Sequence, residues 1–290
     1  FRSRVNPFVL PGGIPNLAAY LISERFQCLG PNMTIVTACA TGTQTIGEAA
    51  SLIDRGLADV IIAGGTEALV MEYSIAGFSA MRALPVNFND NPPAASRPFD
   101  RHREGFVFSE GAAAVVLEKY EHAKARKAPI YAEVLGYASS SEAYNIAAPH
   151  PEGDGAARTM KWALDNARVS PNQIDYINSH GSSTPLNDIS ETKAIKTVFK
   201  QHAKSLVINS TKSMLGHPMG ASGTLEAMVC ILSMVNNLVH PTINLDHPDP
   251  ECDLDYVPHQ ARDYEVNLAM SNSFGLGGQN ACIILKKFEE

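Results

Sequence analysis

The first half of the chain alternates between two hydrophobic patterns. Residues 33–38 (MTIVTA), 59–68 and 111–120 are short apolar or β-branched runs, which predict strands. The Gly pair that ends the second run gives it the look of a buried parallel strand. Residues 41–59 instead place Ile46, Ala49, Ile53 and Leu57 at helical spacing. This half therefore reads as strands that alternate with helices.

The second half repeats this alternation. Helical patterns cover residues 155–168, 190–199 and 220–237, of which the last is strongly apolar. Strand patterns lie between them, and the final stretch predicts strand, Gly-rich turn, strand. The strand patterns begin near residues 130, 173, 206 and 268. Alternating strands and helices predict an α/β architecture with buried sheets, whose polar loops after the strands carry the site.

Composition argues against some classes of protein but does not identify a function. The chain has 290 residues, 45% of them hydrophobic, and a formal charge of −7 with no basic run, which argues against nucleic acid. Five cysteines without zinc spacing indicate a reducing compartment. The apolar stretches look too short to span a membrane, and no signal peptide is visible, although the chain starts at Phe1.

Cys39 is the first candidate for chemistry, because it stands where a β-rich run stops and a helical pattern starts. Most free cysteines are small buried hydrophobes. At a helix N-terminus, however, exposed N–H groups favour the thiolate, which is the nucleophilic form. Both interpretations stay open from this stretch alone.

Two histidines lie in loops rich in small residues. His180 follows a predicted strand, and His217 lies between a strand and a helix. Together with a cysteine at a strand end they match the needs of acyl transfer. Lys212 is either a surface lysine or the partner of Glu226, which lies on the apolar face of the next helix.

The remaining features are ambiguous. Asp188, eight residues after His180, is either part of such a site or a helix N-cap. Residues 271–280 (SNSFGLGGQN) form either a tight β-turn or a wall whose N–H groups point at a reactive centre. They lack dinucleotide spacing, and no glycine cluster has P-loop spacing, so we expect no nucleotide.

Taken together, six motifs resemble the elongating β-ketoacyl-acyl-carrier-protein synthases, which are thiolase-fold condensing enzymes. The resemblance spans nearly the whole chain. The motifs are TACATG, AGGTEA, SRPFDRHREGFVFSEGAA, NSHGSSTPLND, KSMLGHPMGASG and NSFGLGGQN. This resemblance implies a thiolase-like α/β fold of two pseudo-duplicated halves with mixed sheets, divided as residues 1–128 and 129–290.

The resemblance also implies roles for individual residues. Cys39 would carry the acyl chain as a thioester, while His180 and His217 assist malonyl decarboxylation with electrostatic support from Lys212. The other implied site residues are an aromatic near the acyl pocket (Phe78), a basic residue at its mouth (Arg82) and two supporting acids (Asp188 and Glu226). The Gly-rich loop with its oxyanion-hole N–H contributes Phe274, Gly275 and Leu276.

The chemistry implied is a decarboxylative Claisen condensation. We expect the helix N-terminus to lower the pKa of the Cys39 thiol. Neutral imidazoles would stabilise the enolate left by CO2 loss, at roughly 3 kcal/mol per hydrogen-bond donor. The resemblance implies acyl-carrier protein as partner, a homodimer for the complete chain, no metal or organic cofactor, and bacterial cytoplasm or an organelle matrix as location.

Two departures from the family pattern matter. Leu276 replaces the usual gating phenylalanine, so we expect altered chain-length preference. Family members also carry a long stretch before VNPFVLP. The chain therefore looks like a fragment whose first half lacks strands, and we expect residues 1–290 alone to be poorly soluble or inactive.

Other classes of protein fit less well. A biosynthetic thiolase would need a second cysteine in the final Gly-rich loop, and Cys282 lies beyond it. A starter-type condensing enzyme would pair one histidine with asparagine. A non-catalytic subunit of a polyketide synthase would lack the nucleophile, and a cysteine hydrolase would leave Lys212 and the second histidine unexplained.

Overall fold

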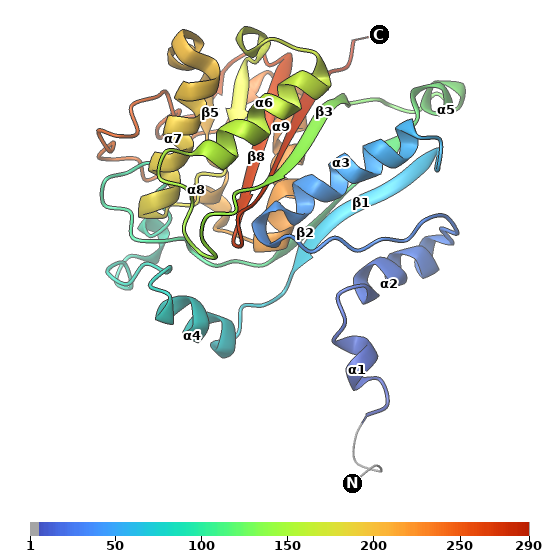
Figure 1. The fold of residues 1–290 in the computed structure, drawn as a ribbon, viewed down its shortest axis with the longest axis horizontal. Helices are drawn as coiled ribbons and strands as arrows, with labels where there is room; N and C mark the ends of the chain where they lie inside the picture. The colour runs from blue at the N-terminus through green and yellow to red at the C-terminus, as the bar shows by residue number, and fades with distance from the viewer. Residues whose placement is uncertain (1–5, 290) are drawn as a thin grey trace.

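The computed structural model describes residues 6–289, so Phe1 lies outside the described part. Its main sheet is mixed, in the order β3-β9-β8-β4-β5 (Figure 1). The strands β4, β5 and β8 run parallel to one another, whereas β9 is antiparallel to both β8 and β3. The five strands are β3 (Ala132–Ser141), β4 (Tyr176–Asn178), β5 (Val207–Asn209), β8 (Leu268–Gly275) and β9 (Gln279–Lys287).

A second, smaller sheet pairs β1 (Val60–Glu67) with β2 (Gly111–Glu118). The sequence pattern predicted a buried parallel strand over the first of these, and this prediction is wrong. The pair is antiparallel, and Val60 and Val116 on its outer face are exposed. Alternating burial, rather than burial on both faces, is what an antiparallel sheet covered on one side shows. A further short pair joins β6 (Leu238–Val239) to β7 (Arg262–Asp263).

Two helices lie between the sheets and form the centre of the molecule. Helices α3 (Thr41–Asp54) and α9 (Ser222–Asn236) pack against each other, and each contacts both sheets. Their apolar faces meet in a core that includes Ile46, Cys230 and Ile283. The periodicity of the sequence predicted both helices, because this face must be apolar to be buried.

Helix α9 contradicts the expectation that every apolar stretch is too short to span a membrane. With the short turn before it, the helix from Met219 to Asn236 is long and apolar enough to cross a membrane by length and composition, whereas the sequence pattern suggested no such segment. However, 61% of that segment is buried inside the protein. It is therefore apolar because it packs between two sheets.

Helices α6 (Asp154–Ala167) and α7 (Pro185–Phe199) cover the other face of the main sheet (Figure 1). A second core forms there around Met160, Ile177 and Ile284. Strand β9 illustrates the two-faced packing: its residues alternate between the two cores, and β8 and β9 are buried almost throughout.

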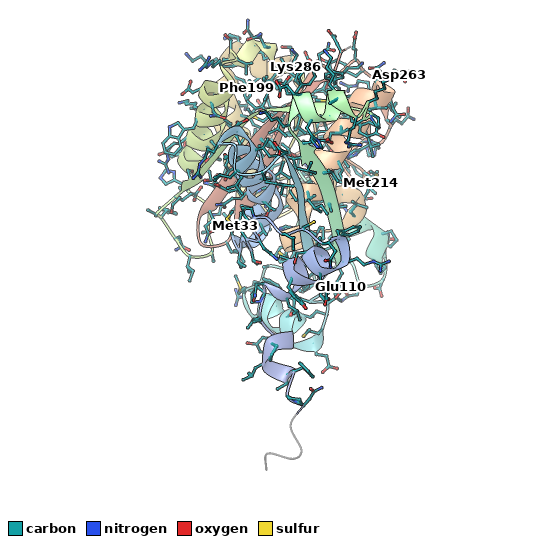
Figure 2. All side chains as sticks on the ribbon, turned by 90° about the vertical axis from the view of Figure 1, so that its right-hand side faces the viewer. Met33, Glu110, Phe199, Met214, Asp263 and Lys286 are labelled. Carbon is teal, nitrogen blue, oxygen red and sulfur yellow. The ribbon has the colours of Figure 1, made fainter. Side chains whose placement is uncertain are left out.

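The N-terminal segment projects from this body (Figures 1 and 2). Helices α1 (Val9–Gly12) and α2 (Leu17–Phe26) have no buried residues. Residues 33–38 were expected to form a strand, but residues 31–37 are irregular because no strand within residues 6–289 pairs with them. The other helices are α4 (Glu72–Ala80), α5 (Tyr120–Ala125), α8 (Lys212–Leu215) and the short 3-10 turns at Ala38–Ala40, Pro92–Ala94, Pro171–Gln173, Lys200–Lys204 and Met219–Ala221.

Candidate active site

Cys39 lies at the entrance to the central helix. It is the middle residue of the 3-10 turn Ala38–Ala40, which runs directly into α3, and only 4% of it is exposed. The residue before it, Ala38, has a φ of 50°, which is unusual for a residue with a side chain. Strained backbone of this kind is often found at functional sites. The turn holds the sulfur toward the second half of the chain.

His217 faces this sulfur from the second half. Its Nε2 lies 3.1 Å from Cys39 Sγ, and its Nδ1 lies 3.0 Å from Ser222 Oγ. Because a serine hydroxyl can either donate or accept, Ser222 can support both neutral tautomers of the imidazole. The backbone N–H of His217 also donates to Val107 O at 2.7 Å. The ring is therefore fixed at both ends.

His180 joins the same cluster from the end of β4. Its ring centroid lies 5.3 Å from that of His217, and it is 3% exposed. The carboxylate of Glu191 on α7 accepts the backbone N–H of His180 at 2.9 Å and of Gly181 at 2.8 Å. Sequence reasoning missed Glu191; the signal was a second acid on the buried face of α7, three residues after Asp188.

Lys212 and Glu226 form a buried ion pair beside the histidines. Each side chain is about 2% exposed, and the ammonium donates to Glu226 Oε1. The interpretation of Lys212 as a surface residue is therefore wrong, because α8 begins inside the protein. The pair places a positive charge close enough to lower the pKa of both histidines.

The Gly-rich loop closes the cluster from the third side. It is both a tight hairpin between β8 and β9 and a wall beside Cys39. The backbone N–H groups of Leu276 and Cys39 both act on the Cys39 thiol in the direction that lowers its pKa. A Cβ on Gly275 would lie 3.3 Å from Cys39 N and 2.7 Å from Thr37 O, so any side chain there would force the loop away from Cys39. Phe274 packs 5.8 Å from the His180 ring.

Aromatic side chains and a methionine complete the surroundings of the sulfur. Phe106 and Met219 pack with Cys39, and Phe78 on α4 packs against this group with its ring 5.2 Å from that of Phe106. Arg82 follows α4 and is exposed. Phe78 is thus part of the apolar cluster around Cys39, whereas the Arg82 side chain is in solvent.

Asp188 was expected at the site, but the structure does not bring it to the histidines. It accepts the backbone N–H of Phe99 at 2.9 Å and pairs with Arg103 at 3.5 Å. It is not the N-cap either, since Thr184 accepts the backbone N–H of Asn187 there. Asp188 therefore holds the segment from Phe99 to Arg103, which packs behind the His180 loop.

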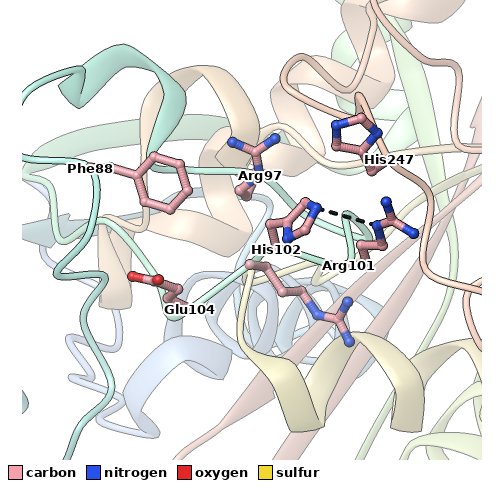
Figure 3. Close-up of a pocket in the computed structure, with 7 residues that line it drawn as sticks. Phe88, Arg97, Arg101, His102, Glu104 and His247 are labelled. Carbon is pink, nitrogen blue, oxygen red and sulfur yellow. Dashed lines mark hydrogen bonds between the residues drawn. The ribbon is translucent and has the colours of Figure 1, made fainter.

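A surface cavity of about 550 Å³ lies beside the segment that Asp188 contacts (Figure 3). Arginines and histidines dominate its lining, but Arg97 and Arg103 already pair with acidic residues. It contains none of the residues that surround Cys39. The lining residues are Phe88, Arg97, Arg101, His102, Arg103, Glu104 and His247. We therefore place the reactive site at Cys39 and not in this cavity.

Burial decides the protonation states at the site. It raises the pKa of the Cys39 thiol to about 11, although Lys212 and the N–H groups of Leu276 and Cys39 act to lower it. The expectation of a lowered thiol pKa is therefore wrong, because loss of solvent outweighs the helix N-terminus. Burial and Lys212 hold the pKa of both histidines well below the usual value. The resting state is a neutral thiol beside neutral imidazoles.

Comparisons with known proteins identify the family. Residues 2–123 match the N-terminal domain and residues 131–246 the C-terminal domain of β-ketoacyl synthase. The chain is 51% identical to 3-oxoacyl-[acyl-carrier-protein] synthase 2 of Staphylococcus aureus, covering 99% of this chain and 69% of that protein. It is 48% identical to the protein of the same name in Coxiella burnetii, over 98% of this chain and 68% of that one.

Comparisons with solved structures point to the same family. A type II polyketide-synthase ketosynthase in complex with its acyl-carrier protein superimposes with a TM-score of 0.97 at 38% identity, covering all of this chain and 71% of that one. A β-ketoacyl synthase from Burkholderia phymatum gives 0.90 at 38% identity, over 95% of this chain and 66% of that one. The chain belongs to the β-ketoacyl synthase family, and its fold is the thiolase-like α/β fold expected from the motifs.

Proposed function

We propose that this protein is a β-ketoacyl-[acyl-carrier-protein] synthase that elongates fatty acids. In this reaction an acyl chain on Cys39 is condensed with malonyl-acyl-carrier protein, and CO2 is released. One observation carries the proposal. Cys39 Sγ lies 3.1 Å from His217 Nε2, in a buried cluster that also contains His180 and two inward N–H groups.

The first step loads the acyl chain. Because burial raises the pKa of the Cys39 thiol to about 11, the thiolate is scarce at neutral pH and a base must accept the proton. The neutral His217 is in position to do so as the sulfur attacks the acyl carbonyl. The N–H groups of Cys39 and Leu276 then stabilise the oxyanion. The pantetheine thiol leaves with that proton, and acyl-Cys39 remains.

The second step uses both imidazoles as hydrogen-bond donors. Loss of CO2 from the malonyl group leaves its electron pair on the thioester enolate. N–H groups of His180 and His217 stabilise the enolate oxygen, each worth roughly 3 kcal/mol. The depressed pKa of each ring keeps it neutral, and Lys212 contributes to that depression. The carbanion then attacks acyl-Cys39 and expels the sulfur.

The proposal includes acyl-carrier protein as the donor of both substrates, with exposed Arg82 at the mouth of the site. It also includes a homodimer for the complete protein, cytoplasmic location and two functional halves that divide near residue 128. The curated relatives carry the acyl-carrier-protein name at 48–51% identity, which favours fatty-acid elongation. Polyketide elongation is the second candidate, because a polyketide ketosynthase shares the backbone with a TM-score of 0.97.

A biosynthetic thiolase is disfavoured by the position of the second cysteine. Cys282 lies in β9 with no exposed surface and packs in the core under α6. It is therefore on a different core from Cys39, which packs with Phe106 and Met219. A second reactive thiol at the Gly-rich loop would be needed for thiolase chemistry.

The experiment compares Cys39→Ala with Cys28→Ala, which changes an exposed thiol instead of the buried one. Acyl transfer from acyl-carrier protein and CO2 release from malonyl-acyl-carrier protein are measured separately. We expect Cys39→Ala to abolish acyl transfer and condensation but to retain measurable decarboxylation, while Cys28→Ala keeps all three. Full condensation by Cys39→Ala would end the proposal. Fatty acyl and poly-β-ketoacyl donors, offered to the unaltered protein, distinguish the two pathways.

A further inference from the structure

The reactive cluster brings together four atoms that transition metals bind. Cys39 Sγ and one ring nitrogen from each of His180 and His217 all lie within 4.8 Å of one another. The thioether sulfur of Met219 lies 3.7 Å from Cys39 Sγ. All four residues are buried. The cluster thus offers one cysteine sulfur, two imidazoles and one thioether.

These spacings suit a tetrahedral metal ion. Ligands at bond lengths of about 2.0–2.3 Å stand about 3.3–3.8 Å apart at the corners of a tetrahedron. The sulfurs of Cys39 and Met219, 3.7 Å apart, already have this spacing. Cys39 Sγ and His217 Nε2 are 3.1 Å apart and need a small separation. The ring nitrogens of His180 and His217 and the Cys39 sulfur lie within 4.8 Å of one another, so closing the coordination requires these side chains to move closer together.

The donor types select the metal. Thiolate and thioether ligands favour Cu(I), whereas Mg²⁺ and Ca²⁺ require oxygen. Among the described residues, the nearby carboxylate of Glu226 pairs with Lys212 through Oε1, so its charge is already compensated. Ser222 fixes the Nδ1 side of His217 and thereby turns Nε2 toward the sulfur, as the outer partners of metal-bound histidines do.

We propose that Cys39, His180, His217 and Met219 form a Cu(I) site that switches off the reactive thiol. As the copper–sulfur bond forms, the thiol proton is released to solvent and copper keeps its oxidation state. The metal is then coordinated by the lone pairs of the Cys39 sulfur and of both imidazoles. Met219 is the residue that distinguishes this site from a zinc site, because a thioether favours Cu(I).

The test is anaerobic competition with a coloured Cu(I)–bicinchoninate complex, without any acyl substrate. The protein is expected to withdraw one equivalent of copper. Cys39→Ala weakens uptake at least a hundredfold, and prior alkylation of Cys39 with iodoacetamide does the same in the unaltered chain. Met219→Leu weakens Cu(I) uptake about tenfold and leaves Zn²⁺ binding unchanged. Leucine conserves volume, so the packing around Cys39 is retained.

Two matched controls address adventitious binding. Cys28→Ala removes an exposed thiol, and His102→Ala removes an exposed histidine whose ring meets that of His247 edge to face at 5.2 Å; both variants keep full copper uptake. Undiminished uptake by Cys39→Ala or by the alkylated protein would overturn the proposal. So would unchanged Cu(I) affinity in Met219→Leu. Because no substrate is present, this outcome is independent of whether the protein condenses acyl chains.

Discussion

Gly275→Ala adds a single methyl group at the wall of the reactive site. The backbone of Gly275 does not have a positive φ, so alanine can adopt its conformation and the effect is one of contact alone. The new Cβ would lie 2.7 Å from Thr37 O and 3.3 Å from Cys39 N. An ordinary contact begins near 3.4 Å, so the two segments must separate by about 0.7 Å. That separation moves the N–H of Leu276 away from Cys39 Sγ.

Overpacking of this kind costs about 1–3 kcal/mol of stability, and a misplacement near 1 Å costs about a hundredfold in rate. We therefore expect loading of Cys39 by acyl thioester to fall about a hundredfold in kcat/KM, while Tm falls by only a few degrees. The matched control is Gly30→Ala, whose added Cβ meets no atom within 4 Å. A loading rate for Gly275→Ala within twofold of the unaltered protein would refute the argument.

Three further changes test other parts of the site. Leu276→Phe is expected to shift chain-length selectivity in loading assays; an unchanged selectivity would show that this side chain does not gate. Glu226→Gln leaves Lys212 charged and unpaired in the interior and should cost about 3–5 kcal/mol in chemical denaturation, with recovery in Lys212→Met/Glu226→Leu; a cost below 1 kcal/mol would argue against the pair. Burial raises the pKa of Glu191 to about 7, so its contribution to stability is present below about pH 4.5 and is lost as pH rises through 7. Relative to Glu191→Gln, the unaltered protein should lose up to about 3 kcal/mol between pH 4.5 and pH 9, and a pH-independent difference would contradict this.

The sequence predicted those features that rest on strong periodicity or on several motifs together. Helices α3, α6 and α9 and the hairpin β8–β9 lie where the patterns placed them, because each buries a continuous apolar face. Cys39, His180 and His217 come from loops that are far apart in sequence, and the structure brings them together as the motifs implied.

Features that depend on a partner element could not be predicted in this way. Residues 33–38 have strand composition, but a strand needs a neighbour, and none pairs with them in the described structure. The direction of β1 depends on β2, about 50 residues later. The thiol pKa depends on how completely the fold removes water from Cys39. Glu191 acquires its role only when α7 packs behind the His180 loop.

The most direct measurement is a structure of the protein with an acyl group on Cys39. The thioester oxygen is expected within about 2.7–3.1 Å of the backbone N–H groups of residues 39 and 276. Both imidazoles are expected on the side of the sulfur where the acyl carbonyl carbon is attached. An acyl oxygen that points away from both N–H groups, or an acyl group attached to any other side chain, would contradict the account.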